Sequence, residues 1–252
     1  RRAHQQRRRD CRRGFHRRPG DAGHAGAVAN LVLQALSILG GRTLVLTTTL
    51  NAMRQIGDAL TVALGHSGEL EVLVQGQGPK RRLMERFREG SSEGGLGCVL
   101  VASASFWEGF DVPGDALQLV VIDKLPFPPP NDPLVEARSQ RLELSGKSSF
   151  SDYSVPEAAV ALKQGAGRLI RSETDQGVLV VCDPRLTGMA YGRRLLACLP
   201  PMRRLHTEVE FEEALGSPQP FLADTKTVYV PAPSAFTLES VAPAMFKPSF
   251  CH

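Results

Sequence analysis

The sequence lacks long apolar runs and has few cysteines. No stretch approaches the ~18–20 apolar residues that a membrane-spanning helix requires, and no secretory signal pattern is visible. The cysteines lie far apart and form no C-x-x-C pair (Cys11, Cys98, Cys182, Cys198 and Cys251). This scatter excludes a zinc or iron–sulfur site assembled from this chain, so no metal ligands are expected. It also predicts reduced thiols in a cytoplasmic protein.

The basic residues are concentrated at the start of the chain. The net charge is +4, but residues 1–20 contain nine arginines and one aspartate, so the rest of the chain carries −4. An arginine-rich arm can bind nucleic acid. The near absence of apolar periodicity over residues 1–24 instead favours a disordered or mis-framed segment. The first residue is Arg rather than Met, which predicts a fragment.

Between residues 25 and 216, apolar strand-like runs alternate with helical patterns. Strands are predicted at 43–48, 71–74, 98–103, 117–122 and 177–182, and helices at 25–39, 50–64, 79–88, 133–144, from 156 onward and at 187–199. This alternation predicts an α/β fold, a parallel sheet with helices on both faces, whose functional loops lie at the carboxyl ends of the strands. Residues 217–252 contain six prolines and little periodicity, which predicts a poorly ordered tail.

A polar stripe is expected on the helix that precedes the last predicted strand. Gln164, Arg168 and Arg171 follow one another at spacings of four and three, which places them on one helical face. Two guanidiniums and an amide there suit the phosphates of a nucleotide. Gly165 and Gly167 each cost a helix interior about 1 kcal/mol relative to alanine, which indicates that something approaches the backbone closely. The alternative is a solvated basic helix face.

A second informative segment, residues 105–114 (SFWEGFDVPG), directly follows a predicted strand. Two carboxylates, Glu108 and Asp111, flank Gly109 in this loop. At the carboxyl end of a strand, such acids often orient a ligand hydroxyl, a metal-bound water or a partner arginine. The alternative is a turn whose aromatic residues fill the core.

Together these segments resemble the ATP-dependent DNA helicases of superfamily 2. QGAGRLIR resembles their last motif, Q-x-x-G-R-x-x-R, and SFWEGFDVPG resembles the motif before it in the form typical of the DinG/XPD group. DKLPFPPPNDPL, CDPRL and YGRRLLACLP are similar to the same group, and the similarity runs from about residue 25 to about residue 205. Among the variants, the sequence is most similar to the bacterial DinG-like branch.

The resemblance implies a RecA-like second motor domain acting on ATP with Mg²⁺ and on single-stranded or forked DNA. It implies that Arg168 and Arg171 act as arginine fingers. A finger of this kind raises the rate of phosphoryl transfer by about 10³–10⁵ in related enzymes. The resemblance also implies that Gln164 positions the nucleotide or couples it to motion. The remaining implied nucleotide-site residues are Glu108, Gly109, Asp111 and Gly167, of which the two acids would link the nucleotide to the DNA track. Backbone contacts to DNA are implied for Thr47, Thr48, Thr49, Ser103 and Ser105.

The sequence also departs from the pattern of a complete motor. Ala102 and Ala104 stand where glycines are expected, and no D-E-x-H-like box or cysteine cluster occurs. The G-K-S tripeptide at 146–148 has Arg141 in place of the first phosphate-loop glycine, and it follows a predicted helix rather than a strand. We therefore do not expect it to be a phosphate-binding loop. We therefore expect a first motor domain on an upstream segment, negligible ATP hydrolysis by this chain alone, and 5′ to 3′ polarity for the intact helicase.

Two other interpretations stay open. A non-enzymatic nucleic-acid-binding or regulatory remnant of a helicase would also lack the first motor domain, and a nucleotide-binding domain of another motor would also carry an arginine stripe. A metabolic enzyme is disfavoured, because the six histidines lie mostly at the ends or in loops and none falls beside a plausible nucleophile.

Overall fold

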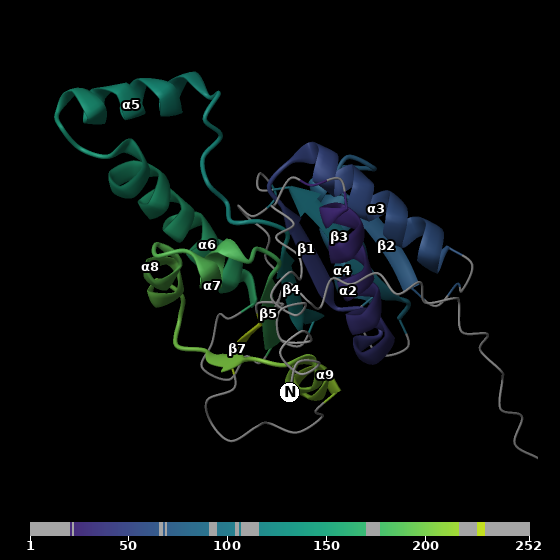
Figure 1. The fold of residues 1–252 in the computed structure, drawn as a ribbon. Coiled ribbons are helices and arrows are strands. Elements are labelled where there is room, and N and C mark those ends of the chain that lie inside the picture. The colour runs from purple at the N-terminus through teal and green to yellow at the C-terminus, as the bar shows by residue number, and fades with distance from the viewer. Residues whose placement is uncertain are drawn as a thin grey trace, which may run out of the picture.

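The computed structural model describes residues 21, 23–65, 68, 70–90, 95–103, 106, 116–169, 177–216 and 226–229. Within these residues the centre of the molecule is a seven-stranded, wholly parallel sheet with the order β2-β3-β1-β4-β5-β7-β6 (Figure 1). The strands are β1 (Thr43–Thr47), β2 (Leu70–Val74), β3 (Gly97–Ser103), β4 (Leu119–Ile122), β5 (Gly177–Val181), β6 (Arg203–Leu205) and β7 (Lys226–Tyr229). The predicted α/β class and parallel sheet are confirmed.

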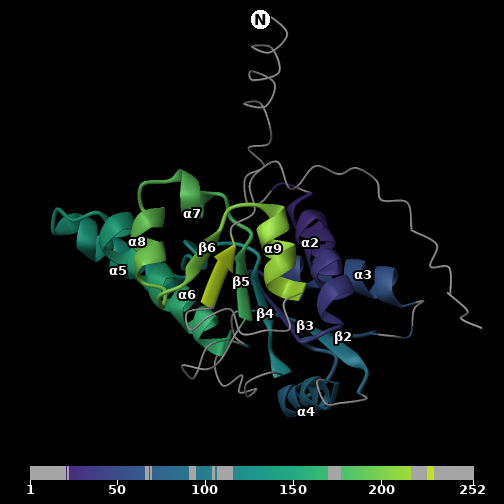
Figure 2. The ribbon, with the colours of Figure 1, turned by 90° about the horizontal axis from the view of Figure 1, so that it is seen from below.

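Helices cover both faces of the sheet (Figure 2). On one face lie α2 (His24–Leu39), α3 (Leu50–Leu64) and α9 (Glu208–Gly216), and on the other lie α4 (Lys80–Gly90), α6 (Val155–Leu169), α7 (Arg185–Gly188) and α8 (Gly192–Ala197). Strand side chains alternate between the two layers: Val45 packs with α2 and α3, whereas Leu44 and Leu46 pack with α4 and α6. The strands are buried on both faces, which is why they are continuously apolar in sequence.

One arm leaves this body. In Figure 1, α5 (Pro133–Leu144) projects away from the sheet, and none of its residues is buried. Asp132 caps α5 by accepting the N–H groups of Leu134 and Val135. A π-helical turn, η4 (Phe150–Ser154), then leads into α6. The arm is joined to the body by three rings, Phe127, Phe150 and Tyr191, whose centroids lie 5.2–5.6 Å apart.

The amino edge of the sheet is packed through glycines. Gly41 has a φ of +125°, and a Cβ added there would lie 2.7 Å from the backbone nitrogen of Cys98. A Cβ added to Gly97 would overlap the carbonyl oxygen of Gly40. The chain can turn into β1 beside the start of β3 only because these positions lack side chains.

The described structure departs from the predicted elements in three places. The segment predicted as one helix, 187–199, forms α7 and α8 with a break at 189–191. Short elements that had no clear periodicity, β6 and α9, follow α8. Residues 226–229, within the predicted tail, form β7 between β5 and β6. The run T-V-Y there favours a strand, a signal that the surrounding prolines obscured. None of the described helices has the length and apolar content needed to cross a bilayer.

Candidate nucleotide and nucleic-acid site

The three threonines that follow β1 have different surroundings. Thr47 is buried, and its hydroxyl lies within hydrogen-bond distance of the carbonyl oxygens of Ala102 (3.3 Å) and Thr49 (3.2 Å). Thr48 is half-buried, and Thr49 is exposed and caps α3 by accepting the N–H of Ala52 at 3.2 Å. The Thr47 hydroxyl therefore supports the turn, while Thr49 and the first two residues of α3, Leu50 and Asn51, are exposed.

Ser103, at the end of β3, is tied to the loop after β2. Its backbone N–H and its hydroxyl both donate to Oε1 of Gln75, at 2.8 and 2.9 Å. The N–H of Gln75 in turn donates to the carbonyl of Val101 at 2.9 Å. Gln75, which the sequence did not single out, thus fixes the carboxyl ends of two strands. Ser105 lies outside the described residues.

Asp123, directly after β4, is fully buried between three elements. Its Oδ1 accepts the backbone N–H of Thr48 at 2.8 Å, and its own N–H donates to the carbonyl of Leu46 at 3.0 Å. Its carbonyl lies 2.8 Å from Nε2 of His24, at the start of α2. Burial raises the pKa of Asp123 to about 6 and lowers the pKa of His24.

Asp183, directly after β5, is a second buried carboxylate. Its Oδ2 accepts the N–H of Leu125 at 2.9 Å, which fastens the loop after β4 to the end of β5. Arg185 reaches back to the same carboxylate through Nε (2.9 Å to Oδ1) and Nη2 (2.6 Å to Oδ2), and this bonding raises the pKa of Arg185. The guanidinium also lies 5.4 Å from the centre of the Phe127 ring. Arg185 is therefore held in one orientation at the carboxyl edge.

These bonds connect the carboxyl ends of five neighbouring strands. We call the residues that make them the carboxyl-edge cluster: Thr47, Thr48, Gln75, Ser103, Asp123, Asp183 and Arg185. Of the predicted DNA-contact residues, Thr47, Thr48, Thr49 and Ser103 come together here.

Sequence reasoning missed Gln75, His24, Asp123, Asp183 and Arg185. A usable signal was present, because Gln75, Asp123 and Asp183 are each the first polar residue at or just after the end of a buried apolar run (LVQ, VVID, VVCD).

The predicted nucleotide residues lie elsewhere. Gln164 is exposed and Arg168 is half-buried, one turn apart on α6. A Cβ added to Gly167 would have no described atom within 4 Å, so the described part of the chain supplies no close neighbour for this glycine. Leu169, at the end of α6, contacts the amino end of β5, where a Cβ on Gly177 would lie 2.5 Å from its Cδ1. The stripe therefore ends near the edge of the sheet opposite the carboxyl-edge cluster.

The remaining predicted nucleotide residues, Glu108, Gly109, Asp111 and Arg171, lie outside the described residues. The connection that contains the two acids starts at the carboxyl end of β3 and finishes at the amino end of β4. Its described flanks, Phe106 and Leu117, belong to the same core as the end of α6. Like every connection between consecutive strands of this parallel sheet, it leads from the carboxyl edge back to the amino edge.

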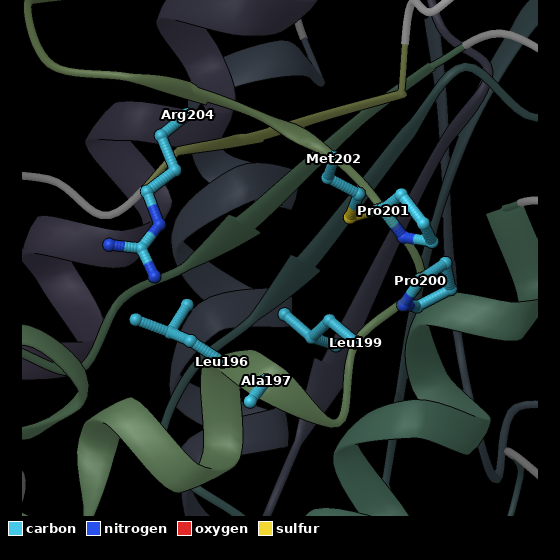
Figure 3. A pocket seen from close by; sticks show the side chains of 7 residues that line it. All are labelled: Leu196, Ala197, Leu199, Pro200, Pro201, Met202 and Arg204. Carbon is cyan, nitrogen blue, oxygen red and sulfur yellow. The ribbon is translucent and has the colours of Figure 1, made fainter.

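Two features that could suggest a ligand site lie away from these residues. The G-K-S tripeptide follows α5 in an exposed turn, with Gly146 at a φ of +76°, as the sequence predicted. A hollow of about 330 Å³ lies between α8 and β6 (Figure 3), and none of the predicted site residues lines it. Among the described residues no group of three or more His, Cys, Asp or Glu could hold a metal ion.

Comparisons with known proteins agree with the fold and the motifs. A family described as the helicase C-terminal domain matches residues 32–202. The ATP-dependent DNA helicase YoaA of Haemophilus influenzae is 42% identical over 178 residues, which are 71% of this chain and 26% of that protein. YoaA of Escherichia coli is 41% identical over 186 residues (74% and 27%), and the ATP-dependent helicase DinG of Mycobacterium tuberculosis is 37% identical over 196 residues (78% and 28%).

The chain thus spans about a quarter of the length of these relatives. A solved structure titled XPD helicase shares the fold, with a TM-score of 0.50 and 19% identity over 69% of this chain and 30% of that one. The match covers well over half of the chain and includes both the α6 stripe and the carboxyl-edge cluster. This chain belongs to the helicase C-terminal domain family.

Proposed function

We propose that this chain is the second motor domain of a DNA helicase that couples ATP hydrolysis to 5′ to 3′ movement along single-stranded DNA. The nucleotide, with Mg²⁺, is held mainly by a first motor domain, because the 252 residues contain no phosphate-binding loop and no D-E-x-H-like box. This chain supplies the residues that complete the nucleotide pocket and part of the DNA track.

One observation carries this proposal: Gln164 and Arg168 lie one turn apart at the end of a packed helix, with Gln164 exposed and no described neighbour over Gly167. An exposed amide one turn before a half-buried guanidinium suits a phosphate group presented by another domain. Arg168, with Arg171 just beyond the described end of α6, would stabilise the charge that develops on the transferred phosphoryl group. Gln164 would contact the same nucleotide from one turn earlier.

The DNA track is assigned to the carboxyl edge. Thr49 is exposed there at the N-terminal cap of α3, and the start of a helix favours anionic phosphates. Such contacts read the sugar-phosphate backbone rather than the bases, as a motor moving over any sequence requires. Glu108 and Asp111 lie on the connection that runs from this edge to the α6 side, so we assign them the coupling of the two sites.

The experiment that tests the proposal compares ATP hydrolysis by the purified 252-residue chain and by the same chain joined to its first motor domain. The chain alone should show negligible turnover with or without single-stranded DNA, and the two-domain protein should show DNA-stimulated turnover. Robust DNA-stimulated hydrolysis by the 252 residues alone would overturn the proposal.

A further inference from the structure

The carboxyl-edge cluster contains one polar atom that the fold itself does not explain. Asp123 is fully buried, yet among the described residues its Oδ2 has no hydrogen-bond partner. The nearest cation is the ammonium of Lys124, 4.0 Å away. A buried carboxylate oxygen without a donor opposes folding. An asparagine could accept the N–H of Thr48 equally well, so the need for that bond does not account for the charge.

Through its carboxylate, Asp123 contacts two candidate phosphate-binding groups, the Thr48–Thr49 turn and the Lys124 ammonium. Through Oδ1 it fixes the backbone of Thr48, directly before the exposed start of α3. Through its N–H it fixes the end of β4 against β1, and through Oδ2 it lies beside Lys124. The Lys124 side chain is 19% exposed, so its ammonium is partly desolvated and its position depends on a nearby negative charge.

We propose that Asp123 is a positioning residue of the DNA track, which holds the Thr48–Thr49 turn and the Lys124 ammonium so that both contact neighbouring phosphates of a single strand. The assignment rests on the proposed function. Lys124 is the phosphate-contacting group, and Asp123 acts through it and through the turn without touching DNA.

The titration of Asp123 makes this role measurable as a pH dependence of DNA affinity. Its neighbours are His24 at the start of α2, the Thr48 turn after β1, Lys124 beside it and Cys182 directly after β5. Burial raises the pKa of Asp123 to about 6, so the carboxylate is lost as pH falls through that value. Burial also lowers the pKa of His24 from its usual value. DNA affinity should therefore weaken as pH falls from about 7.5 to about 5.5, in parallel with protonation of Asp123.

The test measures binding of a fluorescent oligo-dT of about 20 nucleotides to the full chain by anisotropy, as a function of pH and salt. Asp123→Asn should weaken binding about tenfold at pH ~7.5 and remove the dependence on pH between ~5.5 and ~7.5. Lys124→Gln should weaken binding and lower the slope of log affinity against log salt by about 0.7, the value for one phosphate contact on a single strand. The matched control is Asp132→Asn, at the exposed start of α5, which should leave affinity and pH profile unchanged.

The possible outcomes separate the assignment of Asp123 from the proposed DNA track. If wild-type chain binds the oligonucleotide and Asp123→Asn binds it with the same affinity and pH profile, the assignment of Asp123 is wrong while the proposed function stands. If the wild-type chain does not bind at all, the proposed DNA track is overturned together with the assignment. Should Asp123→Asn fail to fold, Lys124→Gln decides, because an unchanged affinity and salt slope would contradict the role of the pair.

Discussion

The two edges of the same sheet are built in opposite ways. At the amino edge, Gly41 and Gly97 let backbone segments approach so closely that no side chain fits. At the carboxyl edge, the strands end in polar residues, including two fully buried aspartates that fasten loops to one another. The amino edge is arranged for packing, whereas the carboxyl edge contains Asp123, a buried carboxyl group whose charged form burial disfavours. The proposed DNA track would account for this difference.

The largest expected effect is on the amino edge. Gly97→Ala places a Cβ against the backbone carbonyl of Gly40. Neither the Cβ, which is fixed to its own backbone, nor the carbonyl can move aside. We expect a loss of about 4 kcal/mol or more in the free energy of unfolding, measured by urea denaturation. The control is Gly167→Ala, where a Cβ has no described atom within 4 Å and should raise helix stability by about 0.5–1 kcal/mol. Equal stability of the two variants would contradict the close packing described for this edge.

The next effect belongs to the carboxyl edge. Asp183→Ala leaves the N–H of Leu125 and the Arg185 fork without their acceptor, in a position that is fully buried. We expect the free energy of unfolding to fall by about 2–4 kcal/mol. Arg185→Ala is the companion variant and should cost less, because the Leu125 bond survives. A smaller loss from Asp183→Ala than from Arg185→Ala would show that the carboxylate does not hold the loop.

The pH dependence of the free energy of unfolding distinguishes the carboxyl edge, which contains Asp123, from the amino edge. Because its pKa is raised from 3.8 to about 6 in the folded chain, folding favours the protonated form. This contribution to stability is complete below pH ~4 and is lost as pH rises through ~6, at most about 3 kcal/mol in total. The stability of Asp123→Asn relative to wild type should therefore increase as pH rises over this range. Thermal unfolding of both proteins across the range checks it, and parallel pH curves would contradict the raised pKa.

The smallest effect is expected at Thr49. Removing its side chain with Thr49→Ala deletes the cap of α3, which should lower the free energy of unfolding by about 1 kcal/mol. Thr49→Ser keeps the capping hydroxyl and should leave stability unchanged within a few tenths of a kcal/mol. Chemical denaturation of the three proteins measures this, and an effect of Thr49→Ser as large as that of Thr49→Ala would rule out the cap.

Sequence pattern alone predicted the elements whose signal is local. The continuous apolar runs of β1, β3, β4 and β5 and the Asp132-Pro133 start of α5 were readable because each carries its own periodicity or cap. The strands β6 and β7 were missed because their segments, RRL and KTVY, carry no continuous apolar run, and partners far away in the chain decide whether such segments pair.

The same limit explains which site residues were found. The α6 stripe is a local motif, so Gln164 and Arg168 could be named from the sequence, and their role stays a prediction. Asp123 and Asp183 bond to backbone groups 75 and 58 residues away, and an aspartate after a strand otherwise predicts only a turn. Their burial, which gives them their chemistry, exists only once the strands are adjacent.

The central claim is that the α6 stripe serves the nucleotide while the carboxyl edge serves the DNA. Arg168→Ala in the two-domain protein tests it most directly, with DNA-stimulated ATP hydrolysis and oligonucleotide affinity measured on the same sample. We predict that kcat falls by about 10³-fold or more while the affinity for single-stranded DNA stays unchanged. Turnover at the wild-type rate, or a loss confined to DNA affinity, would contradict the account.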